Sequence, residues 1–503
     1  MTTEPAPGAV PEQRLHPLSW LFVLVAQLRQ FIVPLLALVV FGQRDDQALW
    51  PLVGVGVLAL VSVWRYFTYR YRVDRDSIVI RSGLLNRHLR EVPFARIHNV
   101  ALHQSLLHRM FDVAEVRLES AGGMKPEAQM QVLKLADAMA LEALVRRRGA
   151  VRTTDGAPAS PADEGDEPGT ILLQLPAREV VRLGLVSNRG LLVLAGGFAA
   201  VSQFNPRLLG TIFEGWGEWA FGFADAHQFD TSAYVMAGAS MVVAVILLLR
   251  LFSILLALLG YFGFRLEEHG RRLTVERGLL TRLRSSVPRR RIQAWTLEEG
   301  LVHRLLRRRS LHVDTAVVAA SGDGQPRGLR ELAPIATPGA CDALVQHLLP
   351  HVAWPPAEWR PLHPRAWWRL AWPGALLSLL ATGALCWRFG GWGLLALAWL
   401  PWSMFVARRH ALNAGYACAG ELLASRAGWW SRYWRFAELD KLQALQWRQS
   451  PVDRLFGMAT LSLDTAGATP LAPPLRLHYL PAGEARALFD RLGTELARRK
   501  MRW

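Results

Sequence analysis

The sequence predicts a membrane protein of the α+β class, in which three pairs of transmembrane helices alternate with three soluble modules of β-strands, each closed by a helix. Two observations support this prediction. Six long apolar segments occur in pairs, although 20% of the 503 residues are charged. The soluble stretches after the second, fourth and sixth segments also repeat one another. With 51% hydrophobic residues, the chain is neither disordered nor collagen-like.

Most of the apolar segments are close to the length that a helix needs to cross the hydrocarbon core of a bilayer, about 20 residues. Half of the 20 tryptophans lie in or beside them, as in the aromatic belts of membrane proteins. The third segment is the shortest. The predicted spans are Trp20–Phe41, Ala48–Trp64, Gly190–Phe204, Tyr234–Leu259, Trp367–Cys386 and Trp392–Val406.

Arginine placement predicts how the chain is oriented. Arginines flank each helix pair on its outer sides, whereas the loop 205–233 within the second pair carries Arg207 against four carboxylates. The positive-inside bias therefore places both termini and all soluble modules in the cytoplasm. The opening segment, Met1–Gln13, has no Lys or Arg and leads into no cleavage site, so we expect the first span to be a retained anchor.

Each soluble stretch carries the same five positions at the same spacing. A glycine comes first, a basic residue follows 13 residues later, a Gln or Glu eight further on, an arginine after another five, and a Ser or Thr 24 residues after the basic one. These agreements in three copies without a gap indicate an internal repeat. The sets are Gly83, Arg96, Gln104, Arg109, Ser120; Gly278, Arg291, Glu299, Arg304, Thr315; and Gly428, Lys441, Gln449, Arg454, Thr465.

Each repeat is expected to be rich in β structure. Tyr71–Ile80 and Val116–Ser120 alternate polar and apolar residues as strands do, and Gly83 lies where a tight turn is needed. A helical pattern closes each repeat, at 136–148, 338–349 and 481–499. Several strands and one terminal helix fit a small barrel or sandwich capped by that helix.

These motifs resemble the bacterial pleckstrin-homology (PH) domain membrane proteins of the YdbS/YdbT type, and the resemblance covers nearly the whole chain. It implies a PH-like barrel in each repeat and a multi-pass protein of the bacterial inner membrane. It brings no catalytic residues to carry over. The middle copy departs most, because Glu298–Gly300 replaces the Gln-Ser pair. The matching motifs are Gly83–Leu85, Val92-Pro93, Arg96-Ile97, Gln104-Ser105, Arg109–Phe111 and Ser120–Gly122, with Gln449-Ser450, Arg454–Gly457 and Thr465–Gly467 in the third copy.

The expected domain order follows from the spans and the repeats. A disordered N-terminus (1–13) precedes helix pair 1 (14–64) and PH-like domain 1 (65–149). A disordered linker rich in Gly, Pro, Asp and Glu (150–170) leads to helix pair 2 (171–262) and PH-like domain 2 (263–350). Helix pair 3 (351–407) and PH-like domain 3 (408–503) complete the chain.

The middle repeat is the most basic part of a chain whose net charge is +17. Eight of its arginines are candidate contacts to anionic lipid headgroups, each worth ~1 kcal/mol near a membrane surface. A solvated cytoplasmic face that merely follows the positive-inside bias would look the same. No aromatic residues are interleaved among them, which argues against nucleic acid as a partner. The candidates are Arg282, Arg284, Arg289, Arg290, Arg291, Arg307, Arg308 and Arg309.

No motif indicates catalysis, a cofactor or a metal site. Signatures such as HExxH, CxxC, GxSxG and the Walker loop are absent. His98, His103 and His108 are five residues apart, but we expect them to lie in turns or on the surface, since metal ligation needs converging ligands. The three cysteines are far apart and form no disulfide framework.

The sequence thus predicts a protein without enzymatic activity whose PH-like modules bind anionic membrane lipids or a protein partner at the cytoplasmic membrane face. A shorter, one-domain relative is one such partner, and a scaffold or an envelope-stress or resistance role fits this reading. The alternative is a component of a transporter or export system that works through the six helices. No acidic residue lies within the predicted spans, which argues against ion-coupled transport.

Overall fold

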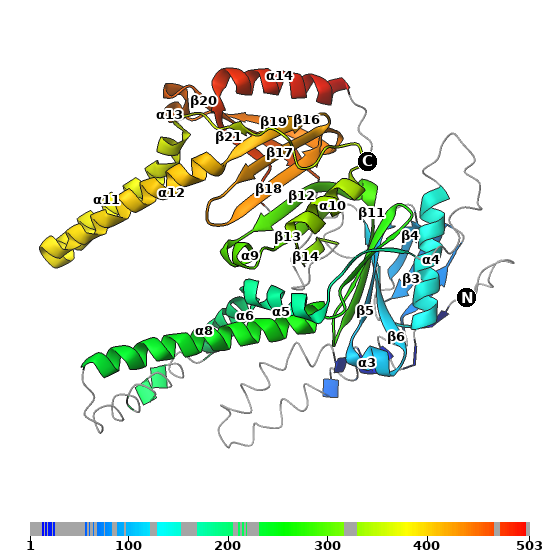
Figure 1. Ribbon diagram of the computed structural model, residues 1–503. Coiled ribbons are helices and arrows are strands. Elements are labelled where there is room, and N and C mark those ends of the chain that lie inside the picture. The colour runs from blue at the N-terminus through cyan, green and yellow to red at the C-terminus, as the bar shows by residue number, and fades with distance from the viewer. Residues whose placement is uncertain are drawn as a thin grey trace. The chain divides into compact units, whose positions relative to one another are not determined.

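The computed structural model contains two compact units (Figure 1). Unit 1 comprises residues 1–167, 174–265 and 276–285, and unit 2 comprises residues 168–173, 266–275 and 286–503. The structure describes residues 76–82, 88–94, 97–120, 128–151, 169–204, 231–315, 329–466 and 473–498, together with parts of 13–25, 56–74 and 210–218. The first two predicted spans and the 150–170 linker lie largely outside these residues.

The first repeat lies in unit 1, where two sheets share one apolar core. One sheet has the order β1-β2-β3-β4, and the other runs from β7 through β6 and β5 to the first residues of β11. Ile78, Val116 and Leu118 are fully buried in this core. The strands are β1 (Gln13–Arg14), β2 (Arg70–Val73), β3 (Ser77–Ser82), β4 (His88–Pro93), β5 (Ile97–Gln104), β6 (Val113–Ser120), β7 (Ala128–Lys134) and β11 (Arg282–Pro288).

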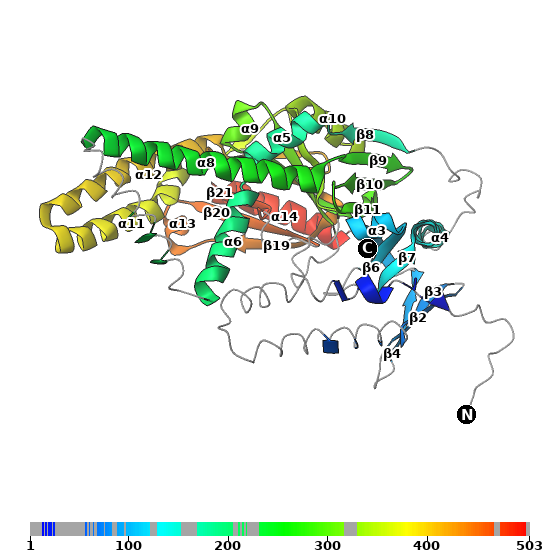
Figure 2. The same cartoon turned by 90° about the horizontal axis from the view of Figure 1, so that it is seen from below.

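Two helices complete this repeat. Helix α4 (Leu135–Val151) lies beside β7, where Figure 2 shows it end-on. Its residues Ala138, Leu141 and Val145 recur at helical spacing and are buried in the core. The short helix α3 (Leu106–Met110) connects β5 to β6, and the Ser105 side chain caps it by accepting a hydrogen bond from the backbone N–H of His108.

Unit 1 also contains α5 (Ala177–Val186), α6 (Arg189–Phe204) and α8 (Thr231–Tyr261). Helices α5 and α6 meet at a bend of 53°. The Arg250 guanidinium of α8 donates to the carbonyl oxygens of Leu185 (3.1 Å) and Ser187 (3.3 Å) and to Asn188 Oδ1 (3.2 Å). It thereby satisfies carbonyls that the end of α5 leaves without helical partners. These hydrogen bonds explain an arginine within the fourth predicted span.

Two helical stretches in the described part of the chain, Val235–Tyr261 and Ala366–Asn413, are long and apolar enough to cross a membrane. A third crossing is possible if the bent pair α5 and α6 is counted as one span. The third to sixth predicted spans are therefore helical, since α6, α8 and the stretch 366–413 coincide with them. The six-span arrangement itself stays a prediction.

The stretch Ala366–Asn413 folds back on itself as an antiparallel hairpin (Figure 1). It consists of α11 (Ala366–Phe389), the 3-10 helix η4 (Gly390–Ala398) and α12 (Trp399–Asn413). Gly390 begins the reversal with a φ of 61°, which favours glycine. The Ser378 hydroxyl donates to the Ala396 carbonyl oxygen at 3.2 Å, which ties the two arms together. This hairpin accounts for the fifth and sixth apolar segments as a pair.

In unit 2, the second and third repeats share one seven-stranded sheet of order β14-β13-β12-β18-β17-β16-β15. Strands β12 and β18 are antiparallel, and Trp295 pairs with Phe436. The second half of one repeat thus continues into the first half of the next, whereas the sequence predicts a separate barrel for each. The strands are β12 (Ile292–Glu299), β13 (Arg309–Thr315), β14 (Glu331–Ala336), β15 (Arg360–Pro361), β16 (Gly415–Ala419), β17 (Leu422–Ala427) and β18 (Arg432–Glu438).

The remaining elements of the second repeat in unit 2 include α10 (Pro338–Leu348), which is capped by Thr337 and buries Cys341 and Val345. The short helix α9 (Leu301–Leu305) connects β12 to β13, and the 3-10 turn η3 (Arg289–Arg291) precedes β12. Unit 2 also holds most of β8 (Thr170–Gln174), β9 (Arg265–His269) and β10 (Arg272–Arg277), which are neighbours in the order β10-β9-β8.

The third repeat ends in a separate sheet of order β19-β20-β21, along which α14 lies (Figure 1). Ala485 and Leu492 of α14 are buried in one core with residues of β16–β18 and of β19–β21. This core joins the shared sheet to the terminal sheet. The elements are η5 (Leu439–Lys441), β19 (Leu442–Arg448), α13 (Pro451–Leu455), β20 (Met458–Thr465), β21 (Arg476–Pro481) and α14 (Ala482–Arg498).

A buried ion pair fixes the contact between β12 and β18. The Arg435 side chain of β18 is 1% exposed and donates to Thr296 Oγ1 at 2.6 Å and to Asp314 Oδ2 at 2.5 Å. Phe436 stacks on Trp295 at 6.2 Å between ring centroids and on Trp354 at 4.0 Å. A slip of the strands by one residue would turn the arginine away from its carboxylate, so this pair specifies the register.

The residues at the positions that the three repeats share have structural roles. The pairs Ile97–Ser120, Ile292–Thr315 and Leu442–Thr465 occupy the same place in β5–β6, β12–β13 and β19–β20, each followed by the same register shift. Gln104 donates to the carbonyl oxygen of Val113, and Gln449 donates to that of Met458. These two hydrogen bonds occupy equivalent places in the first and third repeats. Gly278 and Gly428 have φ values of 111° and 94°, a region that favours glycine.

Removing one partner of the buried pair should be costly. We expect Arg435→Met to destabilise the full chain by ~3–5 kcal/mol, because Asp314 would stay buried without a counter-charge. The double variant Arg435→Met, Asp314→Leu should recover most of that loss. Thermal unfolding of the detergent-solubilised protein measures both, with Arg448→Met on exposed β19 as control. A double variant as unstable as the single one would contradict the expectation.

Candidate functional site

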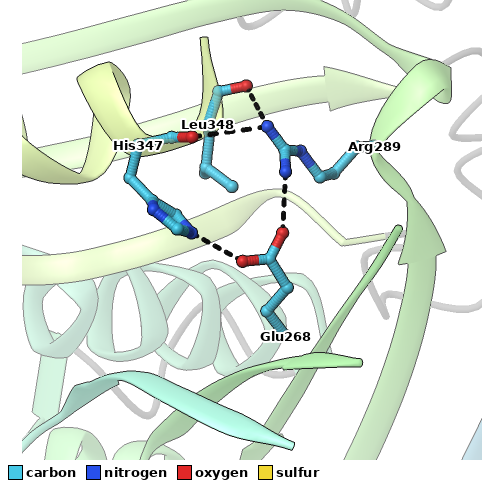
Figure 3. A network of polar contacts seen from close by, with 4 residues as sticks. All are labelled: Glu268, Arg289, His347 and Leu348. Carbon is cyan, nitrogen blue, oxygen red and sulfur yellow. Dashed lines mark hydrogen bonds and ion pairs between the residues drawn. The ribbon is translucent and has the colours of Figure 1, made fainter. Parts of the chain in front are cut away.

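The structure divides the eight candidate arginines of the middle repeat into paired and exposed residues. Arg289 belongs to a network that Figure 3 shows from close by. Its Nη1 donates to Glu268 Oε1 at 2.8 Å, and its Nη2 donates to the Leu348 carbonyl oxygen at 2.5 Å. His347 Nε2 lies 2.6 Å from Glu268 Oε2. Arg289 thus binds the C-terminal end of α10, where a cation is favourable.

Three further arginines have partners within the protein. Arg309 Nε donates to Glu299 Oε2 at 3.0 Å, and its guanidinium lies 4.5 Å from the ring centroid of Trp434. Arg284 forms an ion pair with Glu276 at 3.3 Å. Arg308 donates to the Arg307 carbonyl oxygen at 3.0 Å. Four of the eight candidate arginines therefore have interaction partners within the protein.

Arg291 ends the turn η3 and is half-buried, and burial lowers the pKa of its guanidinium to about 10. Lys441, its counterpart in the third repeat, ends η5 and is also half-buried. The shared position therefore serves local packing. Arg282, Arg290 and Arg307 are exposed. They are the candidates that the structure leaves most accessible to a ligand.

The three histidines of the first repeat lie in β5 and α3. His103 is half-buried, and burial first, then Arg117, lowers its pKa to about 4. His108 Nδ1 lies 2.6 Å from Ser105 Oγ, and its ring packs 4.3 Å from that of Phe22. His98 lies in β5. In the described part of the chain, no group of three or more His, Cys, Asp or Glu could hold a metal ion.

Unit 2 contains a cavity of about 120 Å³ at the end of the helical hairpin that adjoins the third repeat. Leu370 of α11 and His410 of α12 form its helical side, and β16, β17 and β21 form the rest. The volume is several times the ~10–15 Å³ that one water molecule needs. Its polar lining consists of His410, Tyr416, Arg426, Tyr433, Arg476, His478 and Tyr479.

The lining of this cavity is basic and contains no carboxylate. The Nε atoms of Arg426 and Arg476 are buried, and neither has a hydrogen-bond partner among the described residues. The Arg426 guanidinium lies 4.9 Å from the Trp359 ring centroid. Burial lowers the pKa of Arg426, and Arg432 adds to this effect. Buried donors without acceptors are costly, so an anion at this position would be favourable.

Burial shifts the pKa of two side chains in the cavity lining, His478 and Tyr433. Burial first, and then Arg476 and His410, lowers the pKa of His478 to about 4, so the imidazole is neutral at pH 7. Burial raises the pKa of Tyr433, which keeps the phenol protonated. The Tyr416 hydroxyl donates to Glu484 Oε2 at 3.2 Å. Tyr433 and the neutral His478 therefore add hydrogen-bond donors to the two guanidinium groups, whereas the Tyr416 hydroxyl is already bound to Glu484.

Sequence reasoning missed this cavity, because its residues come from three segments about 40 positions apart, between Leu362 and Tyr479. One local signal was available. Arg476 and His478 alternate along β21, which places them on one face of the strand. Arg426 lies two residues before the turn glycine Gly428, but nothing in the sequence shows that it lines a cavity together with α12.

Comparison with known proteins gives the family. Three segments match the Bacterial PH domain family, at residues 21–149, 210–334 and 374–496. The chain belongs to this family. It is similar to the UPF0699 transmembrane protein YdbT of Bacillus subtilis (strain 168), with 21% identity over 469 residues, which are 90% of this chain and 92% of the relative. No solved structure matches the chain.

Each matched segment overlaps one of the three repeats, and the predicted resemblance is confirmed. The chain is a membrane-associated bacterial PH domain protein of the YdbT type with mixed α and β structure. This family consists of PH-domain and transmembrane proteins and is not a known enzyme family.

Arg289 and Arg290 are adjacent but differ in their surroundings, so they form a matched test. We expect Arg289→Gln to lower the free energy of unfolding by ~1–3 kcal/mol, since charged hydrogen bonds to Glu268 and to the end of α10 are lost. Arg290→Gln, at an exposed position, should change it by less than ~0.5 kcal/mol. Thermal unfolding of the full chain decides, and equal effects of the two substitutions would refute a structural role for Arg289.

His478 should make the fold sensitive to acid. The His478 imidazole protonates near pH 6.5 in the unfolded chain but only near pH 4 in the folded chain. The free energy of unfolding therefore falls as the pH decreases through this window. The contribution lost between pH 7 and pH 5 is about 2 kcal/mol. His478→Gln should make the decline shallower by that amount, whereas His88→Gln on exposed β4 should leave it unchanged. Denaturant titrations at the two pH values measure the difference.

Proposed function

We propose that this protein binds anionic lipid headgroups at the cytoplasmic face of the bacterial inner membrane, through the cavity between the α11–α12 hairpin and the third repeat. The observation that carries this proposal is the lining: two guanidinium groups with buried, unpartnered Nε atoms and no carboxylate. A phosphate oxygen would accept from these donors, and guanidinium groups bind phosphate well.

The position of the cavity supports a lipid as the ligand. It lies at the base of an apolar hairpin, where a headgroup of a surrounding lipid can reach it while its acyl chains stay along the helices. The turn that follows Gly428 contributes to this placement. Trp429 packs edge-on against Phe405 of α12 at 5.4 Å, and Trp430 is 55% exposed. Tryptophan is favoured at membrane interfaces, so this turn is suited to lie at headgroup level.

Within this proposal, the exposed arginines of the middle repeat supply a general attraction to an anionic membrane, and the cavity supplies a specific contact. The predicted topology, with six spans and cytoplasmic termini, places both at the same membrane face. The modules would then act as a lipid-bound scaffold rather than as an enzyme. A transporter receives no support from the described helices, because α8, α11, η4 and α12 contain no Asp or Glu.

Lipid titrations of the full chain test the proposal. The protein in neutral nanodiscs should bind short-chain phosphatidylglycerol and should not bind short-chain phosphatidylcholine, as measured by native mass spectrometry. The double variant Arg426→Gln, Arg476→Gln should lose at least about tenfold in affinity, since two charged hydrogen bonds are removed.

Arg448→Gln, at an exposed position of β19, serves as the matched control and should bind normally. Circular dichroism of the double variant confirms that its fold is intact. Inorganic phosphate, tested alone, separates a phosphate site from a lipid site. Unchanged phosphatidylglycerol binding in a folded double variant would overturn the assignment of the cavity.

A further inference from the structure

The chain joins its repeats in the same manner twice. In unit 1, β5 of the first repeat is the neighbour of β11 of the second. In unit 2, β12 of the second repeat pairs with β18 of the third. The repeated arginine reaches across each joint, because Arg109 donates to the Leu279 carbonyl oxygen and Arg304 donates to that of Trp430, both at 3.1 Å. Leu279 and Trp430 each lie just after the turn glycine of the next repeat.

Two strands that are equivalent to these joining strands have no neighbour from another repeat within the described part of the chain. Strand β4 is the equivalent of β11 and β18, and it ends the sheet β1-β2-β3-β4. Strand β19 is the equivalent of β5 and β12, and it ends the sheet β19-β20-β21. The first and third repeats thus carry complementary halves of a joint.

The surfaces of these two edges are exposed where their counterparts are buried. Gln446 on β19 is exposed, whereas its counterpart Thr296 on β12 is buried. Arg90 on β4 is exposed, whereas its counterpart Arg435 on β18 is 1% exposed. Exposed sheet edges are templates for strand pairing, which proteins generally cover or protect.

The charges at the two edges are complementary. In the repeat register, Arg90 corresponds to Arg435, and the hairpin pairings Ile80–Arg90 and Ser425–Arg435 agree with this. Asp464 corresponds to Asp314 and is exposed on β20. Strand β4 therefore carries an arginine at the Arg435 position, and β20, the neighbour of β19, carries a carboxylate at the Asp314 position. At the corresponding place, β11 carries Ser285 instead of an arginine.

We propose that the β19 edge of one copy of this protein pairs antiparallel with the β4 edge of a second copy, in the register of β12 and β18. Gln446 then lies opposite Arg90 of the second copy, and Arg90 reaches Asp464. Arg454, the exposed counterpart of Arg304, is placed to cross this joint as Arg109 and Arg304 cross theirs.

This contact is head-to-tail, so each copy keeps one further edge for the next copy. Repetition of such a contact gives a ring if the rotation closes and an open row if it does not. The association needs no new structural element, since it uses the same strand pairing that joins neighbouring repeats within one chain. It does not depend on the lipid ligand, so either proposal can fail without the other.

Disulfide crosslinking in native membranes tests the register. The full chain, with Cys341, Cys386 and Cys418 replaced by Ala, carries either Gln446→Cys with one tag or Arg90→Cys with another. Directly opposed residues of antiparallel strands have Cα atoms about 4.5–5.5 Å apart, which suits a disulfide. Co-expressed copies should form an oxidised product that contains both tags. Gln443→Cys, three residues out of register, should give little product with Arg90→Cys.

The absence of the doubly tagged product, or equal yields at positions 446 and 443, would overturn the proposal. A product that links Gln446→Cys only to a different protein would assign the edge to another partner and would also refute pairing between copies.

Charge reversal gives an independent readout. Asp464→Arg should weaken association of detergent-solubilised copies about fivefold or more, because like charges then face each other across the strands. Adding Arg90→Asp to the same chain should restore it. Light scattering across a concentration series measures the mass of the assembly. Both positions are exposed, so circular dichroism should show an unchanged fold, and a monomer at every concentration would refute the joint.

Discussion

The buried contact of Arg435 with Asp314 and Thr296 is the interaction on which the architecture of unit 2 depends. It joins a strand of the third repeat to two strands of the second, about 120 to 140 residues earlier in the sequence. A charged group that is 1% exposed tolerates no alternative register, because any slip leaves it in an apolar core without a carboxylate. The stacked rings of Trp295, Phe436 and Trp354 lie on the opposite face of these strands, because successive side chains of a strand alternate between faces.

One consequence is that the repeats are not structurally independent domains. Each joint uses the second half of one repeat and the first half of the next, so the sequence unit and the folding unit are displaced by half a repeat. The repeated residues make sense in this frame: the glycines form turns, the glutamines bridge strands within a repeat, and the arginines Arg109 and Arg304 reach the following repeat.

The candidate site shows how charge in a sequence differs from charge in a fold. Counting arginines points to the middle repeat, yet Arg289 and Arg309 are held by Glu268 and Glu299, which lie 21 and 10 positions away. The cavity of the third repeat contains fewer arginines, but Arg426 and Arg476 keep buried donors without acceptors. What matters for an anion is the balance between donors and acceptors at one place, and only packing shows that balance.

The sequence by itself determined the family, the threefold repeat, the β-rich character of each repeat and the four described apolar helices, because periodicity, spacing and hydropathy are local properties of the chain. Only the tertiary structure decided which strands pair between repeats, that Arg250 serves the end of α5, and which arginines are neutralised. These outcomes depend on contacts between residues far apart in sequence. A pattern of residue types fixes which face of a strand is apolar, but it does not fix which other strand that face or edge will meet.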